Sequence, residues 1–185
     1  MKGFMFFETS GFPFVEELEA STAEIRAEFE RLDPAKFTAW PEKFLYENRW
    51  DVFGLYAFGR RLSGNCGLCA GTTAAVERVP GMVTAGFSWL AAGTHIKPHR
   101  GYTDSVLRCH LPLIVPDGCA LRVGGETRGW EEGRCMIFDD TVEHEAWNRG
   151  DSPRVILLLD FVKPGHRYAA GVTAEAAGAA ARMGG

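Results

Sequence analysis

The sequence lacks any long apolar run, which bounds its relation to membranes. No stretch approaches the roughly 18 uninterrupted apolar residues that indicate a transmembrane helix. The apolar start of the chain, residues 1–7, is interrupted at Glu8 and is too short for the apolar region of a signal peptide. We therefore expect a soluble, cytoplasmic protein that does not contact a membrane.

The sequence also lacks a large excess of positive or negative charge. The chain carries 20 lysines and arginines against 24 aspartates and glutamates, for a formal net charge of −4. Nucleic acids and anionic membrane surfaces attract strongly basic proteins, so neither is expected as a partner. Individual arginines can still bind a small anion.

The sequence has few cysteines, and their spacing does not form a framework. Five occur in 185 residues, and no second Cys-x-x-Cys follows the pair Cys66 and Cys69. A disulfide scaffold or a complete zinc site would need more regular spacing. The interpretation is reduced, structural cysteines, with half a zinc site or a redox pair at Cys66 and Cys69 as the alternative.

The length and the changing residue pattern predict one domain made of two parts. Residues 1–80 are helical and rich in aromatics, residues 81–163 carry short strands, and the domain ends near residue 167. The last part, residues 168–185, is rich in alanine and glycine and is expected to be a frayed helix or disordered.

The first part contains one clear helical signal. Ser21 and Glu24 have the spacing of a capping box, in which each side chain bonds the other's backbone N–H. An apolar stripe at helical spacing follows, at Ile25, Phe29 and Leu32, and Pro34 ends it. The aromatic-rich segment of residues 37–58 is predicted to form short helices and loops packed against a sheet.

The second part shows the two-residue period of β-strands. The expected strands are residues 82–91, 106–115, 120–123, 135–138 and 154–162, separated by turn-forming residues. Several short strands without intervening helices indicate a sandwich or barrel. Because side chains alternate along a strand, Arg108 and His110 should share one face, as should Arg154 and Asp160.

Two histidines are candidate metal ligands. His99 lies at an expected turn and His144 lies 45 positions later, beside an expected strand. Imidazole suits iron, copper, zinc and nickel, so the pair does not select the metal. Non-haem iron sites often add a carboxylate two residues after the first histidine, but here that residue is Gly101. His95 is assigned a surface or supporting role, because Pro98 opposes a continuing helix.

Two arginines in the expected strands need anionic partners if they are buried. Arg108 and Arg154 could each bind a carboxylate of a small dianion. Ser88, on a neighbouring expected strand, could add a hydroxyl donor. The structural alternative is a buried ion pair, for instance Arg154 with Asp160 or Arg108 with Asp104.

Taken together, these motifs resemble those of the aspartyl/asparaginyl β-hydroxylase family. The resemblance runs from about residue 87 to residue 161, with a looser likeness before it. It rests on Pro98-His99-x-Gly101, Leu107-Arg108-x-His110-Leu111, Arg122-Val123-Gly124, Trp130-x-x-Gly133, Phe138-Asp139-Asp140, His144-Glu145-Ala146-Trp147-Asn148 and Arg154-Val155-x-Leu157.

The resemblance implies a mainly β fold with N-terminal helices, a double-stranded β-helix of the jelly-roll or cupin type. It also implies Fe(II) as metal and 2-oxoglutarate and O2 as cosubstrates. His99 and His144 would bind iron, with Gly101 where related dioxygenases carry an acidic ligand. Arg154 and Ser88 would bind the distal carboxylate of 2-oxoglutarate, with Arg108 and His110 near its other end. Pro112 departs from the family pattern and removes a strand donor.

The implied function is hydroxylation of an unactivated C–H bond. The expected position is the β-carbon of an aspartyl, asparaginyl or related group in a small molecule or peptide. Basic residues near the expected barrel mouth could hold an acidic substrate of this kind: Arg100, Arg122, Arg128 and Arg149. Two alternatives stay open: a halogenase, with chloride in the space left by Gly101, and a non-catalytic cupin-like binding module. Asp140 or Glu143 could also supply the missing carboxylate, or support His144 from the surrounding turn.

Overall fold

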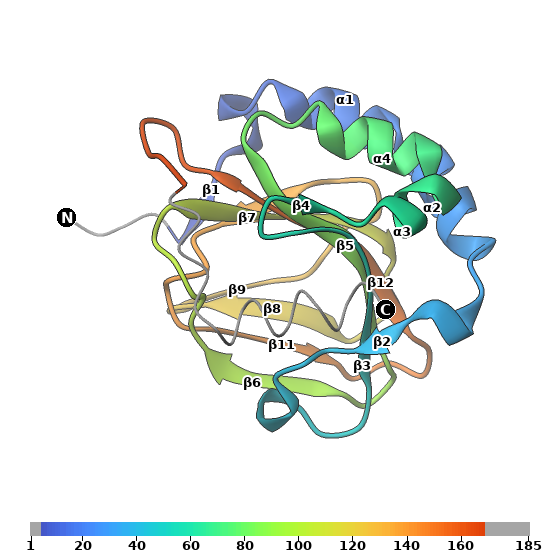
Figure 1. Ribbon diagram of the computed structural model, residues 1–185. Helices are drawn as coiled ribbons and strands as arrows, with labels where there is room; N and C mark the ends of the chain where they lie inside the picture. The colour runs from blue at the N-terminus through green and yellow to red at the C-terminus, as the bar shows by residue number, and fades with distance from the viewer. Residues whose placement is uncertain (1–4, 169–185) are drawn as a thin grey trace.

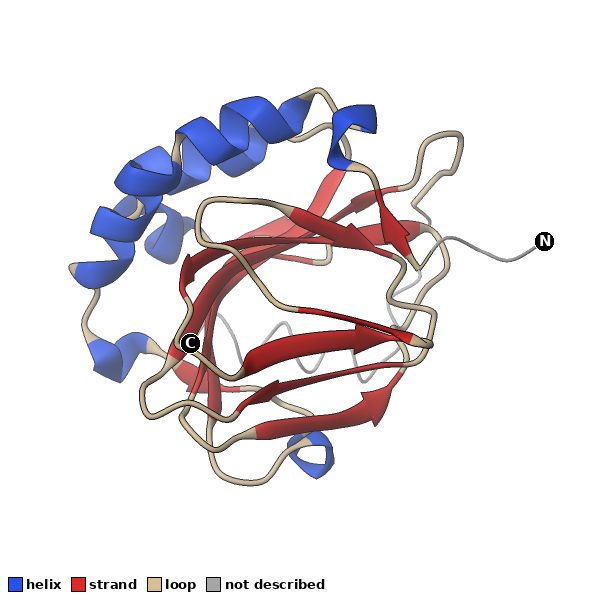
Figure 2. Cartoon of the chain, turned by 180° about the vertical axis from the view of Figure 1, so that it is seen from behind, coloured by secondary structure: helices blue, strands red, loops and turns tan. Residues whose placement is uncertain are grey.

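Two antiparallel sheets face each other and form the body of the protein. The computed structural model describes residues 5–168. Figure 1 shows helices α1, α2 and α4 along the outer side of the larger sheet, with the smaller sheet on its other side. In the reverse view of Figure 2, the strands enclose the interior while the helices stay outside it.

The helices lie in the first half of the chain, as the sequence predicts. The α-helices are α1 (Phe14–Ala20), α2 (Thr22–Glu30), α3 (Ser63–Leu68) and α4 (Ala70–Glu77). Three short 3-10 turns accompany them, η1 (Thr9–Gly11), η2 (Pro34–Lys36) and η3 (Lys43–Leu45).

The larger sheet has eight strands and forms one side of the interior. Its order is β1-β10-β7-β12-β5-β3-β2, with β4 paired to β3. The bounds are β1 (Phe6–Phe7), β2 (Thr38–Ala39), β3 (Trp50–Ala57), β4 (Arg60–Arg61), β5 (Met82–Leu90), β7 (Val106–Ile114), β10 (Met136–Phe138) and β12 (Arg154–Val162).

The smaller sheet has four strands in the order β6-β11-β8-β9. The bounds are β6 (His95–His99), β8 (Cys119–Val123), β9 (Glu126–Arg128) and β11 (His144–Asn148). All five predicted strands are therefore present to within a residue or so at each end.

The larger sheet has one apolar face and one mixed face, as the predicted alternation requires. Cys109, Leu111, Leu157 and Leu159 pack in the core beneath the helices. On the opposite face, Arg108, His110, Arg154 and other members of the same two strands line the interior. Polar groups buried this deeply need hydrogen-bond or ion-pair partners, either within the protein or on a bound ligand.

Two local expectations from the first half are wrong. Ser21 is the N-cap residue of α2, but its hydroxyl donates back to the carbonyl of Glu17 at 3.0 Å, so no capping box forms with Glu24. The aromatic-rich segment includes the eight-residue strand β3, which pairs with β5 in the larger sheet. Its residues are nearly all buried on both faces, so the two-residue polar alternation that signals a half-buried strand is missing.

Pro112 sits inside β7 and is accommodated by a local irregularity. Ile156 of β12 is opposite Pro112, and the register shifts between Val155 and Ile156. The extra residue is Leu113 on β7, so the ladder is irregular directly beside a residue that cannot donate a hydrogen bond. The pairing on the other side of this point continues, so the residues facing the interior keep their register.

The alanine- and glycine-rich end of the chain, expected to be frayed or disordered, lies outside the described residues apart from Tyr168. Within residues 5–168, none of the helices has the length and apolar character needed to cross a lipid bilayer.

Candidate active site

The two candidate metal ligands meet across the smaller sheet. His99 is the last residue of β6, and His144, the first residue of β11, is its direct partner in the antiparallel ladder. Cross-strand partners project side by side, and the two imidazole centroids are 4.2 Å apart. The structure thus brings together two histidines that are 45 positions apart in the sequence.

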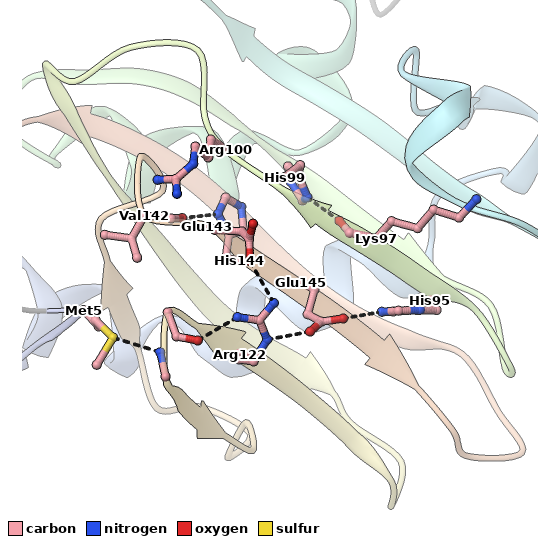
Figure 3. Close-up of polar contacts among 12 residues, drawn as sticks. Met5, His95, Lys97, His99, Arg100, Arg122, Val142, Glu143, His144 and Glu145 are labelled. Carbon is pink, nitrogen blue, oxygen red and sulfur yellow. Dashed lines mark hydrogen bonds and ion pairs between the residues drawn. The ribbon is translucent and has the colours of Figure 1, made fainter.

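Backbone carbonyls orient both rings in the same way. His99 Nδ1 lies 2.7 Å from the carbonyl oxygen of Lys97, and His144 Nδ1 lies 2.9 Å from that of Val142, as Figure 3 shows. Each Nδ1 therefore carries the proton and donates it, which leaves the two Nε2 lone pairs for a metal.

The environment keeps both imidazoles neutral. Burial lowers the pKa of His99, and the positive charge of Arg108 lowers it further. Burial, the neighbouring His99 ring and Arg108 together lower the pKa of His144 to about 3. Neutral imidazole is the form that ligates metals, so the pair is prepared for a cation.

Asp140 lies against Gly101, the residue at which non-haem iron sites often carry a carboxylate ligand. Gly101 donates its backbone N–H to the Asp140 carbonyl at 2.7 Å, and a Cβ on Gly101 would collide with the Asp140 carboxylate. That carboxylate is fully buried, and neither oxygen accepts a hydrogen bond from the described residues. Burial raises its pKa to about 6, although Arg108 opposes this.

Asp140 is nevertheless not placed as a third ligand. Within residues 5–168, no group of three or more His, Cys, Asp and Glu side chains is positioned to hold a metal. Glu143 instead points toward Arg122, with 3.3 Å between Oε1 and Nη2. The protein groups available to a metal here are the two imidazoles, and the Asp140 carboxylate lies beside them with its Oδ2 3.4 Å from Arg108 Nη2.

Arg154 is a buried cation without an anionic partner. Its side chain is 1% exposed, and Nη2 donates to Ser88 Oγ at 2.9 Å. Nε has no hydrogen-bond partner, and among the described residues no carboxylate lies within 4.0 Å of the guanidinium. The guanidinium stacks 5.0 Å from the ring centroid of Trp130. Burial lowers its pKa to about 10. The ion pair with Asp160, considered as the structural alternative, does not form, because Asp160 is paired with Arg108.

Ser88 is held in place by a second donor. The indole Nε1 of Trp50 donates to Ser88 Oγ at 2.9 Å, and Arg154 donates to the same oxygen. With both lone pairs of the oxygen engaged, the hydroxyl hydrogen is free to be donated to an incoming acceptor. Arg154 and Ser88 thus present N–H and O–H donors to one point in the interior.

Arg108 differs from Arg154 because it already has its anions. Nε and Nη2 donate to the two carboxylate oxygens of Asp160 at 2.8 and 2.9 Å, and Asp140 Oδ2 lies 3.4 Å from Nη2. Burial alone would lower the pKa of Arg108, but Asp160 and Asp140 outweigh that effect and raise it. The partner is Asp160, its cross-strand neighbour, and not the suggested Asp104.

His110 faces the interior between the two arginines. Trp130 Nε1 donates to His110 Nδ1 at 3.2 Å, which leaves the proton on Nε2. That Nε2 is buried without a partner. Burial and the charges of Arg154 and Arg108 lower the pKa of His110 well below its ordinary value. It is therefore a neutral donor aimed into the same space.

Glu145, His95 and Arg122 lie on the outer side of the smaller sheet. Glu145 alternates with His144 and so points outward, where it contacts His95 Nε2 at 2.6 Å and pairs with Arg122 (Figure 3). His95 is half exposed and remote from the interior, in agreement with its assigned surface role. Arg128 is paired with Glu126. These two arginines therefore already have acidic partners.

A small cavity connects these groups. Its polar lining contains all six residues selected from the sequence: Ser88, His99, Arg108, His110, His144 and Arg154. Two residues in or beside this site, Trp50 and Trp130, were not selected. No spacing signal distinguishes them from the many aromatics of the core, although Trp130 belongs to one of the family motifs.

The cysteines lie away from this cavity. All five are buried and free, and Cys66 Sγ contacts the carbonyl of Leu55 at 3.3 Å. Burial raises the pKa of Cys69 to about 12, which keeps its thiol protonated and unreactive. Within the described residues, no metal cluster forms around Cys66 and Cys69.

The donor set fits a metal with a chelating dianion. Two neutral imidazoles supply two nitrogen ligands for a metal. The unpaired Arg154 guanidinium, Ser88 and His110 offer donors to an anionic group deeper in the cavity. A 2-oxo diacid would satisfy both sets at once, because one end can chelate the metal while the other meets the guanidinium.

Comparison with known proteins agrees with this geometry. The profile of the family described as aspartyl/asparaginyl beta-hydroxylase matches residues 19–164. An ornithine lipid ester-linked acyl 2-hydroxylase of Rhizobium tropici is 41% identical over 169 residues, which cover 85% of this chain and 60% of that protein. The human aspartyl/asparaginyl beta-hydroxylase is 36% identical over 168 residues, which cover 85% of this chain but only 22% of that protein.

Solved structures of low sequence similarity share the fold. A 2OG-Fe(II) oxygenase family oxidoreductase from Burkholderia pseudomallei aligns with a TM-score of 0.53 at 12% identity, covering 80% of this chain and 90% of that one. A Pseudomonas putida prolyl-4-hydroxylase aligns with a TM-score of 0.50 at 16% identity, covering 80% and 88%. The predicted jelly-roll fold, mainly β with N-terminal helices, is confirmed.

Proposed function

Because this chain belongs to the aspartyl/asparaginyl β-hydroxylase family, we propose that it is an Fe(II)- and 2-oxoglutarate-dependent hydroxylase of an unactivated C–H bond. His99 and His144 would hold the iron through Nε2. When bound, the metal would supply, with O2 and 2-oxoglutarate, the oxidising chemistry by which one oxygen atom enters the substrate and the other enters succinate, with release of CO2.

The observation that carries this proposal is the unpaired charge of Arg154. A guanidinium that is 1% exposed and has no carboxylate partner is costly to keep in a folded protein. Binding a carboxylate of 2-oxoglutarate would give it a bidentate, charge-assisted partner and remove that cost. Ser88 would donate its hydroxyl hydrogen to the same carboxylate.

The other interior groups would set the orientation of the cosubstrate. His110 can donate its Nε2 proton to an oxygen near the metal, because Trp130 holds its Nδ1 as the acceptor. Asp140, beside Gly101, can accept a hydrogen bond from a water or a substrate group next to the histidines. The apolar walls exclude bulk water, which strengthens each of these contacts.

The two groups of relatives differ in the substrates that their names state. One acts on an ester-linked acyl group of a lipid, and the other on aspartyl or asparaginyl residues. The chain spans about 60% of the first protein and 22% of the second, so their full activities do not transfer directly. Hydroxylation of an aliphatic C–H bond is common to both, and it is the activity we propose. The aspartyl or asparaginyl β-carbon in a small molecule or peptide stays a prediction.

The two alternatives receive less support from the site. A halogenase would need room for chloride beside Gly101, and the Asp140 carboxylate lies against that residue. An anionic side chain there repels a second anion. A binding module without turnover has no need for two free imidazole nitrogens beside an unpaired guanidinium.

The test is anaerobic addition of Fe(II) and 2-oxoglutarate to the purified protein. A weak visible charge-transfer band of the chelated keto acid is expected, and His99→Ala should abolish it while the protein stays folded. Absence of the band in folded, metal-loaded wild type would refute the proposed function. With a substrate present, the product mass measured with and without chloride separates the two activities: an added oxygen indicates hydroxylation, and chlorine in place of hydrogen indicates halogenation.

A further inference from the structure

Strand β6, which ends at His99, contains one residue more than the stretch of β11 that it pairs with. Three cross-strand pairs give the register: His95 with Trp147, Ile96 with Ala146, and His99 with His144. Between the last two pairs, β11 has only Glu145, whereas β6 has both Lys97 and Pro98. Two residues opposite one form a β-bulge, and we call residues 97 and 98 the β6 bulge.

The side chains of the β6 bulge both lie on the solvent side of the sheet. Lys97 and Pro98 are exposed, whereas successive side chains of a regular strand point to opposite faces. β6 is at the edge of the smaller sheet, and edges and bulges are the places where a sheet tolerates proline, which has no N–H to donate. The chain returns to regular pairing at His99, whose side chain lines the cavity beside His144.

The β6 bulge gives the His99 ring an acceptor that a regular strand would not supply. His99 Nδ1 lies 2.7 Å from the carbonyl oxygen of Lys97, two residues earlier (Figure 3). In a regular strand the carbonyls lie along the ladder hydrogen bonds, in the plane of the sheet, and the side chains stand perpendicular to that plane. A ring therefore does not reach the carbonyl two residues before it in the same strand. A bulge bends the backbone locally, so the Lys97 carbonyl is turned towards the ring.

His144 obtains the same hydrogen bond without a bulge. Its Nδ1 lies 2.9 Å from the carbonyl oxygen of Val142, which is also two residues earlier. Because His144 is the first residue of β11, Val142 belongs to the preceding turn and its carbonyl lies outside the ladder. His99 is instead the last residue of β6, so the residue two before it would belong to the ladder if β6 were regular. The two ligands thus need different backbones to hold their rings in the same way.

The backbone that follows His99 is fixed independently of the β6 bulge. Gly101 donates its N–H to the carbonyl of Asp140 at 2.7 Å, and Arg100 Nη1 donates to the carbonyl of Thr141 at 2.9 Å. Both bonds attach this part of the chain to the turn that precedes β11. The backbone position of His99 is therefore held from this side, and the carbonyl in the bulge decides the rotation and the tautomer of the ring.

We propose that Pro98 is a positioning residue: as the extra residue of β6, it turns the Lys97 carbonyl to His99 Nδ1 and so leaves Nε2 free for a metal. A metal-binding imidazole is oriented by the acceptor of its other N–H, and loss of such an acceptor typically weakens metal binding about 10- to 100-fold. The inference rests on the proposed function for the identity of the metal. The tautomer of the ring, however, can be measured without any metal.

The first experiment determines the histidine tautomers of the metal-free full-length protein by 15N NMR, at about pH 8, where imidazoles are neutral. In wild type, His99 and His144 should carry the proton on Nδ1, and His110 should carry it on Nε2. Deletion of Pro98 should make β6 regular, so His99 should become a mixture of tautomers while His144 and His110 stay unchanged as internal controls. Pro98→Ala keeps the extra residue and with it the bulge, so this matched control should retain the wild-type tautomer.

The second experiment measures binding of Fe(II) alone, under nitrogen, by titration calorimetry. Deletion of Pro98 should weaken binding about 10- to 100-fold, whereas Pro98→Ala should stay close to wild type. His99→Ala gives the level of binding that remains when the ligand itself is lost. Thermal unfolding establishes that each variant is folded, and size-exclusion chromatography reports its oligomeric state.

The competing role of the β6 bulge is to protect the edge of the sheet from pairing with another chain. That role predicts self-association of the deletion variant with the His99 tautomer and the Fe(II) affinity of wild type, and this result overturns the proposal. A wild-type spectrum with the His99 proton on Nε2 also overturns it, and this measurement needs no variant to fold. If the deletion shifts the His99 tautomer but wild type binds no Fe(II), the positioning role of Pro98 stands and the proposed function is refuted.

Discussion

Two buried arginines in one cavity should respond in opposite ways to the same substitution. Arg108 is bidentate to Asp160, whereas Arg154 contacts the neutral hydroxyl of Ser88 and no carboxylate. We predict that Arg154→Met does not lower the unfolding free energy of the ligand-free protein by more than about 1 kcal/mol, because the substitution removes an uncompensated buried charge. Arg108→Met should cost about 3–5 kcal/mol, because it leaves Asp160 buried without its partner.

Binding of 2-oxoglutarate, in contrast to stability, should be weakened by Arg154→Met. Loss of one charge-assisted contact at Arg154 is worth roughly 1.5–3 kcal/mol, which corresponds to about a 10- to 150-fold weaker interaction. A ligand that binds the native state raises the unfolding temperature by mass action, so 2-oxoglutarate should stabilise wild type but not Arg154→Met at the same concentration.

The assay is thermal unfolding of wild type and both variants, with and without Fe(II) and 2-oxoglutarate under nitrogen, followed by denaturant unfolding for free energies. The reasoning is refuted if Arg154→Met is destabilised as much as Arg108→Met. It is also refuted if 2-oxoglutarate stabilises Arg154→Met as strongly as it stabilises wild type, since the dicarboxylate would then bind elsewhere.

Three further predictions concern single residues. His144→Ala should abolish turnover and weaken iron binding; retained activity with full iron affinity would remove it as a ligand. Glu28 is buried and accepts from Gly71 N and from the N–H and hydroxyl of Thr72; burial raises its pKa, but these bonds outweigh burial and lower it. Glu28→Gln should therefore cost about 1–3 kcal/mol of unfolding free energy at pH 7, and the difference from wild type should shrink as the pH falls through the ordinary range of a glutamate and below it. Asp140, whose pKa is raised to about 6, should change stability with pH in the opposite direction, because its protonated carboxyl favours folding. The unfolding free energy should therefore rise as the pH falls from about 7 to 4. Asp140→Asn should remove this pH dependence, which denaturant titration at each pH measures.

The β-rich half of the protein was predictable because its signals are local. Alternation of side chains along a strand assigned Arg108 and His110 to one face, and the two-residue period located the strands on which they lie. The motifs around His99 and His144 indicated the family, and with it the jelly-roll fold. β3 was missed because both of its faces are buried, so its sequence shows no alternation.

What each candidate residue contacts could not be derived from the sequence. The choice of Asp160 over Asp104 as partner of Arg108 depends on the register between β7 and β12, which is set by the packing of the whole sheet. The same register leaves Arg154 without an anion. Both arginines look alike in the chain, and only their neighbours on adjacent strands distinguish a structural ion pair from a candidate ligand-binding group.

The sequence by itself determined the type of site: two histidines, a glycine where a carboxylate is common, and arginines on interior-facing strand positions. The tertiary structure decided how that site is used. It placed Asp140 against Gly101 and joined His99 to His144 across a sheet. These are contacts between segments far apart in the chain, and residue type and spacing carry no information on distances that only strand pairing and packing create.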